Sequence, residues 1–410
     1  MSWDTITFSQ LYDSDSRNGL TKPSKVRGSG WKMINMGELF ANDRIYDIPM
    51  ELVPLTEKEK ESAKVEEGDL LFARQSLVLE GAGKCSIVMG VSPLTVFESH
   101  IIRVRLKHDL ANPLFYYYYF RSAFSPIKTI VSQCAQAGIR GSDLQELSVV
   151  FPPIDQQNRI AGILTAYDDL IEANQRQIKL LEEAARRLYK EWFVDLRFPG
   201  HENVPVVDGV PEGWRRVSLD DVLLKISTGL NPRKNFVLGR GQNYYVTIKN
   251  MGDNDIYLDD KCDKVDDEAI QKINSRSDLQ TGDILFSGIG TIGRVYLISI
   301  PTNNWNVSES VFTMRANDKI TNEYLYMILL SDDLQQYCDH HAHGAAQRGI
   351  RMADLRAYRL LLPSEEVLQC FSRMAKPLIE KTQSLQKQNK FLTEGRERLL
   401  PKLMHGEIEV

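Results

Sequence analysis

The glycine cluster GIGTIG at residues 288–293 is the first part of the sequence that could do chemistry, because it has the G-x-G-x-x-G spacing of a dinucleotide-binding turn. The strand-like run DILFS precedes it, but the run RVYLI that follows also has the composition of a strand. A dinucleotide site needs a helix at that place, with its N-terminus facing the pyrophosphate. The sequence therefore favours a glycine-rich hairpin without a cofactor.

Histidines and cysteines give no clear metal or redox site. His340, His341 and His343 could bind a metal, but no Cys, Asp or Glu supports them at ligand spacing, and a solvated loop is the favoured interpretation. The five cysteines are scattered and never form a C-x-x-C pair, which is typical of reduced cytoplasmic thiols. The sequence also lacks a P-loop, the Asn/Asp-Pro-Pro-aromatic motif of adenine methyltransferases, and any nucleophile–base constellation. It predicts a binding protein rather than an enzyme.

Composition agrees with a cytoplasmic globular protein of two or three domains. The 410 residues are 42% hydrophobic and 26% charged, which excludes wholesale disorder. No run approaches the roughly 18 apolar residues of a membrane span, and the first residues do not resemble a signal peptide. The formal charge of −5 argues against indiscriminate polyanion binding, but it leaves room for local basic faces.

The chain contains an internal repeat. AQAGIRGSDL at residues 135–144 matches AQRGIRMADL at residues 346–355, an offset of 211 positions. With small shifts, GDLLF at residues 68–72 matches GDILF at residues 282–286. So many matches in the same order indicate a duplicated unit rather than two unrelated domains.

Each copy divides into a mostly-β head and a long helix, so we expect the α+β fold class. Short β-type runs separated by Gly, Pro and Asn turns fill each head, with helices expected at residues 112–122 and 322–331. Four adjacent tyrosines, Tyr116 to Tyr119, could stack on bases, but most are expected in the core. The expected boundaries are residues 1–150 for the first head, 151–198 for a spacer helix, 199–211 for a linker, 212–362 for the second head and 363–410 for the C-terminal helix.

Both long helices carry an apolar seam. In residues 154–195 the seam follows an unbroken 4,3 spacing, which is typical of a coiled coil, and the helix would span roughly 60 Å. In residues 365–403 the seam is interrupted by Thr382, Asn389 and Arg396. We expect the two helices to pair, and the alternative is two independent helices that each pack on their own head. The expected seam residues are Ile160, Leu164, Tyr167, Ile171, Ile178, Leu181, Leu188, Trp192, Leu378, Leu385, Leu392 and Leu399.

Two heads held by paired helices suit duplex DNA with two half-sites about 34 Å apart. Three loops recur in both copies and carry basic, amide or hydroxyl side chains. Lys and Arg can reach phosphate, and Arg or Gln can read guanine or adenine in the major groove. The candidate DNA-binding residues are Thr21, Lys22, Ser24, Lys25, Arg74, Gln75, Lys84, Gln136 and Arg140 in the first copy, and Asn231, Arg233, Lys234, Ser287, Arg294, Gln347, Arg348 and Arg351 in the second.

These features together resemble the DNA specificity subunit of type I restriction–modification systems. The repeated Gly-Asp-Leu/Ile-Leu-Phe runs and the segment PPIDQQNRIA at residues 152–161 carry the resemblance, which covers essentially the whole chain. It implies two target-recognition domains that read a bipartite, asymmetric DNA sequence, and an antiparallel coiled coil that acts as a ruler between them. One departure is that the second helix begins with PSEE and lacks the Pro-Pro and Gln of the first.

The resemblance also implies partners and a cofactor that the chain itself does not hold. Two methyltransferase subunits, which bind S-adenosylmethionine, would modify adenine, and two restriction (motor-endonuclease) subunits would complete the complex. Two alternatives stay open at this point: a coiled-coil scaffold without DNA contact, and a specificity module of a type II-like methylase–nuclease.

Overall fold

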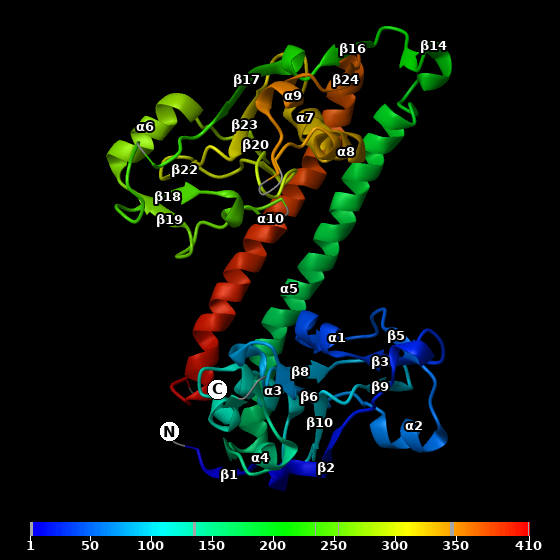
Figure 1. Ribbon diagram of the computed structural model, residues 1–410, viewed down its shortest axis with the longest axis vertical. Coiled ribbons are helices and arrows are strands. Elements are labelled where there is room, and N and C mark those ends of the chain that lie inside the picture. The colour runs from blue at the N-terminus through cyan, green and yellow to red at the C-terminus, as the bar shows by residue number, and fades with distance from the viewer. Residues whose placement is uncertain (1–2, 134–136, 234, 253, 345–347, 409) are drawn as a thin grey trace. The chain divides into compact units, whose positions relative to one another are not determined.

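A computed structural model describes residues 3–133, 137–233, 235–252, 254–344, 348–408 and 410 (Figure 1). The chain divides into two compact units. Unit 1 comprises Met1–Glu172 with Lys390–Val410, and unit 2 comprises Ala173–Asn389. Each unit therefore contains one head together with a segment of each long helix. No helix of the described residues has the length and apolarity that a membrane crossing needs.

Unit 1 is built on a five-stranded sheet with the order β2-β10-β6-β8-β4. Its central strands are buried on both faces, which explains their continuous apolar runs. Smaller sheets have the orders β1-β13, β11-β12-β7 and β5-β3-β9. The strands are β1 Thr5–Thr7, β2 Tyr12–Asn18, β3 Trp31–Ile34, β4 Arg44–Ile45, β5 Glu51–Val53, β6 Leu70–Ala73, β7 Gln75–Ser76, β8 Cys85–Val88, β9 Thr95–Phe97, β10 Ile101–Leu106, β11 Ser132–Gln133, β12 Ala137–Gly138 and β13 Ser148–Val150; the short helices are α1 Met36–Ala41, α2 Glu57–Ala63, α3 Pro113–Arg121 and α4 Gly141–Gln145.

Unit 2 repeats this topology, as the internal repeat predicts. The sheet β17-β23-β20-β21 has the pairing of β2-β10-β6-β8, and β19-β18-β22 has the mixed antiparallel and parallel pairing of β5-β3-β9. The strands are β14 Val206–Val207, β15 Val210–Pro211, β16 Arg215–Ser218, β17 Leu223–Thr228, β18 Asn243–Val246, β19 Asp263–Val265, β20 Ile284–Ser287, β21 Val295–Leu297, β22 Trp305–Val307, β23 Val311–Ala316 and β24 Arg359–Leu362; the short helices are α6 Asp267–Ser277, α7 Asn322–Leu329, α8 Asp332–His340 and α9 Met352–Arg356.

The repeated Gly-Asp-x-Leu-Phe run has the same structural role in both units. Gly68 and Gly282 adopt positive φ angles of 87° and 92° and turn the chain into β6 and β20. The buried carboxylates of Asp69 and Asp283 each accept two hydrogen bonds from an arginine on the neighbouring strand, at 2.6–2.9 Å. The partners are Arg105 on β10 and Arg315 on β23. A bidentate, charge-assisted pair thus locks the central strands of each sheet.

Several local predictions are confirmed. The helices expected at residues 112–122 and 322–331 are α3 and α7, and Tyr116 to Tyr119 are all buried in the core. The glycine cluster at residues 288–293 connects the antiparallel strands β20 and β21, so it is a hairpin connection without a following helix. In α3 the side chain of Asn112 accepts hydrogen bonds from the first turn, and Pro113 occupies the first helical position.

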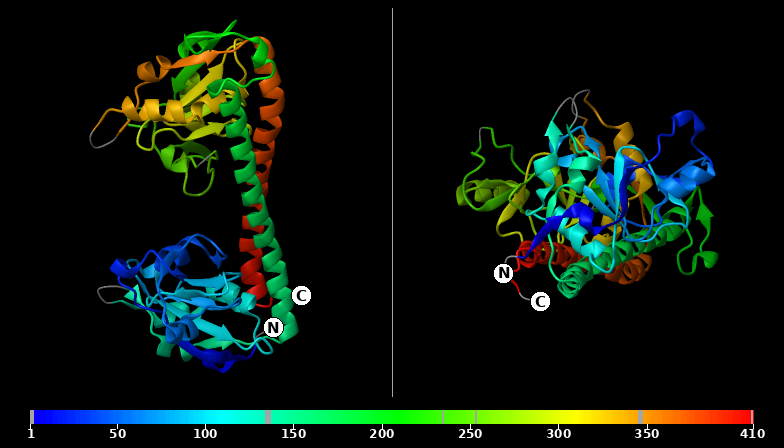
Figure 2. Two further views of the ribbon diagram at one scale, coloured as in Figure 1. Left: turned by 90° about the vertical axis from the view of Figure 1, so that its right-hand side faces the viewer. Right: turned by 90° about the horizontal axis from the view of Figure 1, so that it is seen from below.

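The two long helices are α5 (Ile154–Tyr189) and α10 (Glu365–Met404). The end of the first differs from the prediction, because residues Lys190–Val194 form a π-helical turn. Within unit 1, Ile160 and Leu164 of α5 share one buried cluster with Leu403 of α10. Within unit 2, the Trp192 ring at the end of the first helix lies 5.9 Å from the Phe371 ring. In each unit the two helix segments therefore lie side by side and antiparallel (Figure 2).

The helix segments also pack on the heads, so the two alternatives considered for them are both partly realised. In unit 1 the head contacts the N-terminal part of α5 and the C-terminal part of α10. Among the expected seam residues, five are buried and seven are half-buried. The buried ones are Ile160, Leu164, Ile171, Trp192 and Leu385; the half-buried ones are Tyr167, Ile178, Leu181, Leu188, Leu378, Leu392 and Leu399.

Two of the polar interruptions in the second seam are matched by polar residues on the first helix. In unit 1, Arg396 forms an ion pair with Asp168, whose other oxygen accepts a hydrogen bond from the Tyr118 hydroxyl at 2.7 Å. In unit 2, the Asn174 amide donates to the side chain of Asn389 at 2.8 Å. Buried polar pairs of this kind specify the register of a coiled coil. Arg396 and Asn389 therefore help to fix the register of the two helices.

We predict that Arg396→Met destabilises unit 1 by about 2 kcal/mol, because the Asp168 carboxylate, in a residue only 5% exposed, would lose its charged partner. Urea denaturation followed by circular dichroism measures the change. The exposed neighbour Arg398→Met is the matched control and should change stability by less than about 0.5 kcal/mol. Equal midpoints for Arg396→Met and the control would contradict the assigned role.

Candidate nucleic-acid interface

Three recurring loops meet in each unit around one short backbone segment, which we call the connector. The connector is residues 98–100 between β9 and β10 in unit 1, and residues 308–310 between β22 and β23 in unit 2. The first loops are residues 19–25 and 229–234, the second loops are residues 74–76 and 287–288, and the third loops are residues 136–140 and 347–351. Each of these segments recurs and carries polar side chains, and the fold brings the described residues of the three loops together.

The first loop leaves β2 or β17 and passes directly over the connector. In unit 1 the Ser99 amide donates to Leu20 and the Leu20 amide to Phe97, at 3.0 and 2.8 Å. In unit 2 the Gly229 amide donates to the Ser308 carbonyl at 3.2 Å. Gly19 and Gly229 lie so close that a Cβ on either would overlap with the carbonyl oxygen of Phe97 or Val307. Glycine is required at both places for this close approach.

The second and third loops are joined to the connector by equivalent hydrogen bonds. The amides of Arg74 and Gly288 donate to the carbonyls of His100 and Ser310, at 2.8 and 2.9 Å. The carbonyl of Arg74 then accepts from the Ile139 amide at 2.9 Å, and the carbonyl of Gly288 from the Ile350 amide at 2.8 Å. In unit 1 the strand pairing of β7 with β12 continues this contact. The second loop is thus the bridge between the connector and the third loop.

The connectors are the functional candidates that the sequence analysis missed. FESHII at residues 97–102 and VSESVF at residues 307–312 stand at an offset of 210, one less than that of the clearest repeat, and lead into the central strand of each sheet. Their polar residues gave no basic or amide signal, so only the repeat could have shown them. His100 is exposed in unit 1, whereas Glu309 in unit 2 is a partner of the first loop.

In unit 2 the first loop is held by a carboxylate. Glu309 accepts hydrogen bonds from the Asn231 amide at 2.6 Å and from the Tyr245 hydroxyl at 3.2 Å. Burial, together with the charge of Glu309, raises the pKa of Tyr245 well above its usual value, so this hydroxyl stays a donor. The predicted base-reading residue Asn231 is therefore engaged within the protein, while Arg233 is exposed. Lys234 lies outside the described residues.

In unit 1 the first loop carries one tethered and one free lysine. Lys22 forms an ion pair with Glu59 of α2 at 2.8 Å. Hydrogen bonds from Lys22 and from Thr56 hold the pKa of Glu59 below its usual value, so the pair persists at neutral pH. Lys25, like Thr21 and Ser24, has an exposed side chain. Of the two predicted lysines, Lys25 therefore has the more exposed side chain.

Three of the predicted residues, in the second loop of unit 2 or at the turns that follow the second loops, have structural roles instead. The Ser287 side chain is fully buried, and its hydroxyl accepts a hydrogen bond from the Arg294 amide. The Arg294 guanidinium donates to the carbonyls of Ile248 and Met251. Lys84 donates to the Phe40 carbonyl at 2.7 Å and pairs with Asp43. Direct DNA contact by these three side chains does not fit their geometry.

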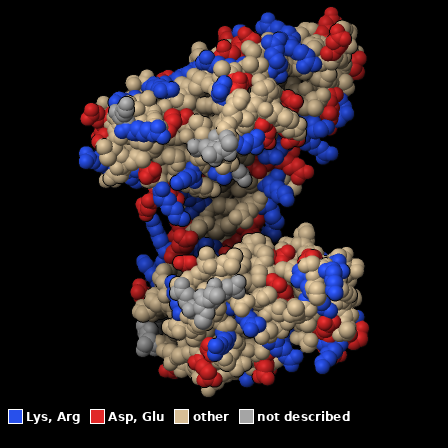
Figure 3. All heavy atoms as spheres, in the orientation of Figure 1, with Lys and Arg blue, Asp and Glu red and all other residues tan. Residues whose placement is uncertain are grey.

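The remaining candidates lie at or near the surface of the two units. Arg74 and Gln75 are half-buried, and Arg140, Arg348 and Arg351 are exposed. Arg348 already donates to the Asp339 carbonyl at 2.8 Å. On the face drawn in Figure 3, lysines and arginines stand in small groups between neutral and acidic surface. Gln136 and Gln347 lie outside the described residues.

The histidines are exposed, as the solvated-loop interpretation predicts, but the first of them lies in a helix. His340 is the last residue of α8 and His341 follows as its C-cap, with its ring stacked on Tyr337. His343 lies 3.2 Å from the Asp354 carboxylate. The sequence did not predict helix α8, which Ser331 caps at its N-terminus and which Leu334 and Cys338 anchor in the core.

Comparisons with known proteins agree with the repeat. The sequence profile of the family described as "Type I restriction modification DNA specificity domain" matches residues 2–183 and 211–393. The type I restriction enzyme MjaIX specificity subunit of Methanocaldococcus jannaschii is 26% identical over 349 residues, which cover 83% of this chain and 79% of that protein. The HindI specificity subunit of Haemophilus influenzae is 26% identical over 328 residues, which cover 65% and 70%.

The fold is also similar to a solved structure. The crystal structure of the type I restriction–modification S subunit from M. genitalium has a TM-score of 0.65 and 15% sequence identity, and the match covers 98% of this chain and 96% of that one. This likeness is one of fold. The two stretches matched by the family profile correspond to the two copies of the internal repeat.

We predict that Gly229→Ala displaces the first loop of unit 2 and destabilises that unit by about 2 kcal/mol, because the new Cβ would overlap with the Val307 carbonyl. Thermal or urea denaturation and limited proteolysis of the loop measure the effect. The control Gly162→Ala lies in α5 with nothing near its Cβ and should be neutral or stabilise by up to about 1 kcal/mol. A Gly229→Ala protein that matches wild type would refute the close approach.

Proposed function

The chain belongs to the family of type I restriction–modification DNA specificity domains, and we propose that it reads a bipartite, asymmetric duplex DNA target with one half-site for each unit. The chain performs no catalysis in this proposal. Two methyltransferase subunits, each with bound S-adenosylmethionine, methylate adenine, and two restriction subunits complete the complex. This chain supplies the sequence recognition.

One observation carries the proposal. The same three loops meet at the connector in both units, and the second and third loops do so through equivalent backbone hydrogen bonds, whereas the side chains that the loops present differ. Two related domains that recognise different DNA sequences need the same backbone arrangement of their loops with different side chains on them. Residues 41–64 and 253–274 also differ between the units, with helix α2 shorter than α6. We therefore expect two unlike half-sites.

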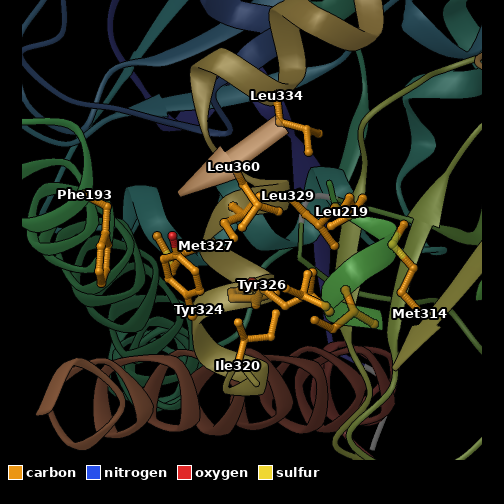
Figure 4. Close-up of a cluster of buried hydrophobic side chains, with 14 of the residues drawn as sticks. Phe193, Leu219, Met314, Ile320, Tyr324, Tyr326, Met327, Leu329, Leu334 and Leu360 are labelled. Atoms are coloured by element: carbon orange, nitrogen blue, oxygen red, sulfur yellow. The ribbon is translucent and has the colours of Figure 1, made fainter. Parts of the chain in front are cut away.

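A groove in unit 2 supports the partner part of the proposal. It has a volume of about 850 Å³ and runs beside the C-terminal part of α5. Phe193, Tyr324 and Met327 line it and belong to the buried apolar cluster of unit 2 (Figure 4). Arg186, Arg187, Arg216, Arg359 and Lys190 also line it and outnumber the carboxylates of Glu183, Asp332 and Asp333. None of the four arginines takes part in an ion pair of the described residues. We assign this groove to an acidic, partly apolar segment of a methyltransferase subunit.

We predict that replacing Lys25, Arg140, Arg233 and Arg351 by alanine lowers DNA affinity and reduces the slope of log K against log salt by about 3 to 4, because each phosphate contact contributes about 0.9 to that slope. All four side chains are exposed. Fluorescence anisotropy of the complex with its methyltransferase, over a series of salt concentrations, measures the slope. Mapping methylated adenines in source DNA first gives the target.

The control for this experiment removes the same charge from the helices. Arg176, Lys179, Lys376 and Lys381 are also exposed, and their replacement by alanine should leave the slope nearly unchanged. Equal slopes for the two quadruple variants would exclude the loops from the interface. If the wild-type complex protects no DNA target, that result would favour the alternative of a scaffold without DNA contact.

We predict that Arg186→Glu with Arg187→Glu lowers the affinity for the methyltransferase subunit by tenfold or more, because two charges in the groove would then repel an acidic segment. Isothermal titration calorimetry with the purified subunit measures the affinity. The control, Arg176→Glu with Lys179→Glu, makes the same charge change on α5 outside the groove. An equal effect of both pairs would show that net charge, not the groove, governs association.

A further inference from the structure

Unit 1 carries an apolar loop tip at the candidate interface. Leu77, Val78 and Leu79 follow β7 and are 89%, 59% and 47% exposed. Single exposed apolar residues are common, but three in succession on one tip leave a patch that calls for a partner. The patch follows directly after Gln75 and Ser76 of the second loop.

The tip is held in shape rather than loose. The Val78 amide donates to the Ser76 hydroxyl at 3.2 Å, and the Val78 carbonyl accepts from the Gly81 amide at 3.1 Å. Leu79–Gly81 form a 3-10 turn whose next amide, from Ala82, donates to Leu79 at 3.3 Å. The side chain of Leu77 is therefore presented to solvent by a fixed backbone, which lowers the entropy cost of inserting it into a partner.

The neighbours of the tip point to DNA as that partner. Gln75 and Ser76 pair with Gly138 and Ala137 of the third loop, so the tip projects from the place where the loops converge. The exposed Arg140 stands two residues beyond that pairing. An apolar wedge beside basic and amide side chains is the arrangement by which DNA-bending proteins enter a base step.

We propose that Leu77, supported by Val78, inserts between two base pairs of the half-site read by unit 1 and partly unstacks them. This inference rests on the proposed function. The wedge would make recognition depend on how easily that step deforms, so flexible pyrimidine–purine steps would be favoured there. Specificity would then include a position that no side chain reads by hydrogen bonding.

The described residues of unit 2 form no equivalent wedge, which gives the proposal an internal contrast. At the corresponding place Ile289 pairs with Gly349, and Ile292 packs against the core of the unit. Only the small or polar residues Gly290 and Thr291 are exposed there. The distortion is therefore expected in one half-site and not in the other.

Permanganate, which oxidises unstacked thymines, tests the wedge on the full complex with its methyltransferase bound to the mapped target. The half-site of unit 1 is identified by crosslinking from Ser24→Cys. Wild type should show enhanced reactivity at one step of that half-site. Leu77→Ala should remove the enhancement, keep the footprint, and lower affinity by about tenfold, as expected for one buried leucine. The control Leu224→Ala, at a leucine of β17 that is 67% exposed, should change neither.

Each other outcome would overturn the wedge. Reactivity that persists in Leu77→Ala would come from base extrusion by the methyltransferase. Loss of methyltransferase binding with unchanged DNA reactivity would make the tip a protein-docking surface. A complex without any footprint on the mapped target would refute the proposed function, and the wedge with it, whereas a normal footprint without enhanced reactivity would refute the wedge alone.

Discussion

The backbone of the connector is the constraint on which the candidate interface depends. A segment of three residues accepts and donates the hydrogen bonds that position the first and second loops, and the second loop then positions the third. These bonds join main-chain atoms, and residue type is restricted only at Gly19 and Gly229, where a Cβ would overlap with a carbonyl oxygen. Side chains on the loops can therefore change without disturbing the frame. Because the backbone arrangement does not depend on most of these side chains, one fold can present two different recognition surfaces.

The central sheets of the two units are held by the same polar pair. In each unit a buried aspartate accepts two hydrogen bonds from an arginine of the adjacent strand, and a glycine with positive φ brings that aspartate into place. The long helices add a second level of specification, since Asp168 meets Arg396 and Asn174 meets Asn389. Apolar seams alone would tolerate a shift along the helix axis, and these polar pairs oppose it.

The duplication made most of the fold predictable from the sequence, because each strand run or helix seen in one copy could be checked in the other. The paired long helices followed from the seam spacing, and the glycine hairpin from the strand-like run after it. Side-chain roles could not be predicted in the same way. Ser287 and Arg294 have suitable types, yet burial and backbone carbonyls use them inside the protein. The connector was missed because main-chain hydrogen bonds leave no mark in residue type.

The make-up of unit 1 has a consequence for synthesis of the protein. Leu403 and Met404 of α10 belong to the same buried cluster as Phe8 and Tyr116 of the first head. Domains commonly fold in order as the chain leaves the ribosome. Here the first head cannot complete its core until the end of α10 has been made, whereas all of unit 2 has emerged earlier. Until then, part of the apolar surface of the first head stays exposed. The head that is translated first is therefore the one whose core is completed last.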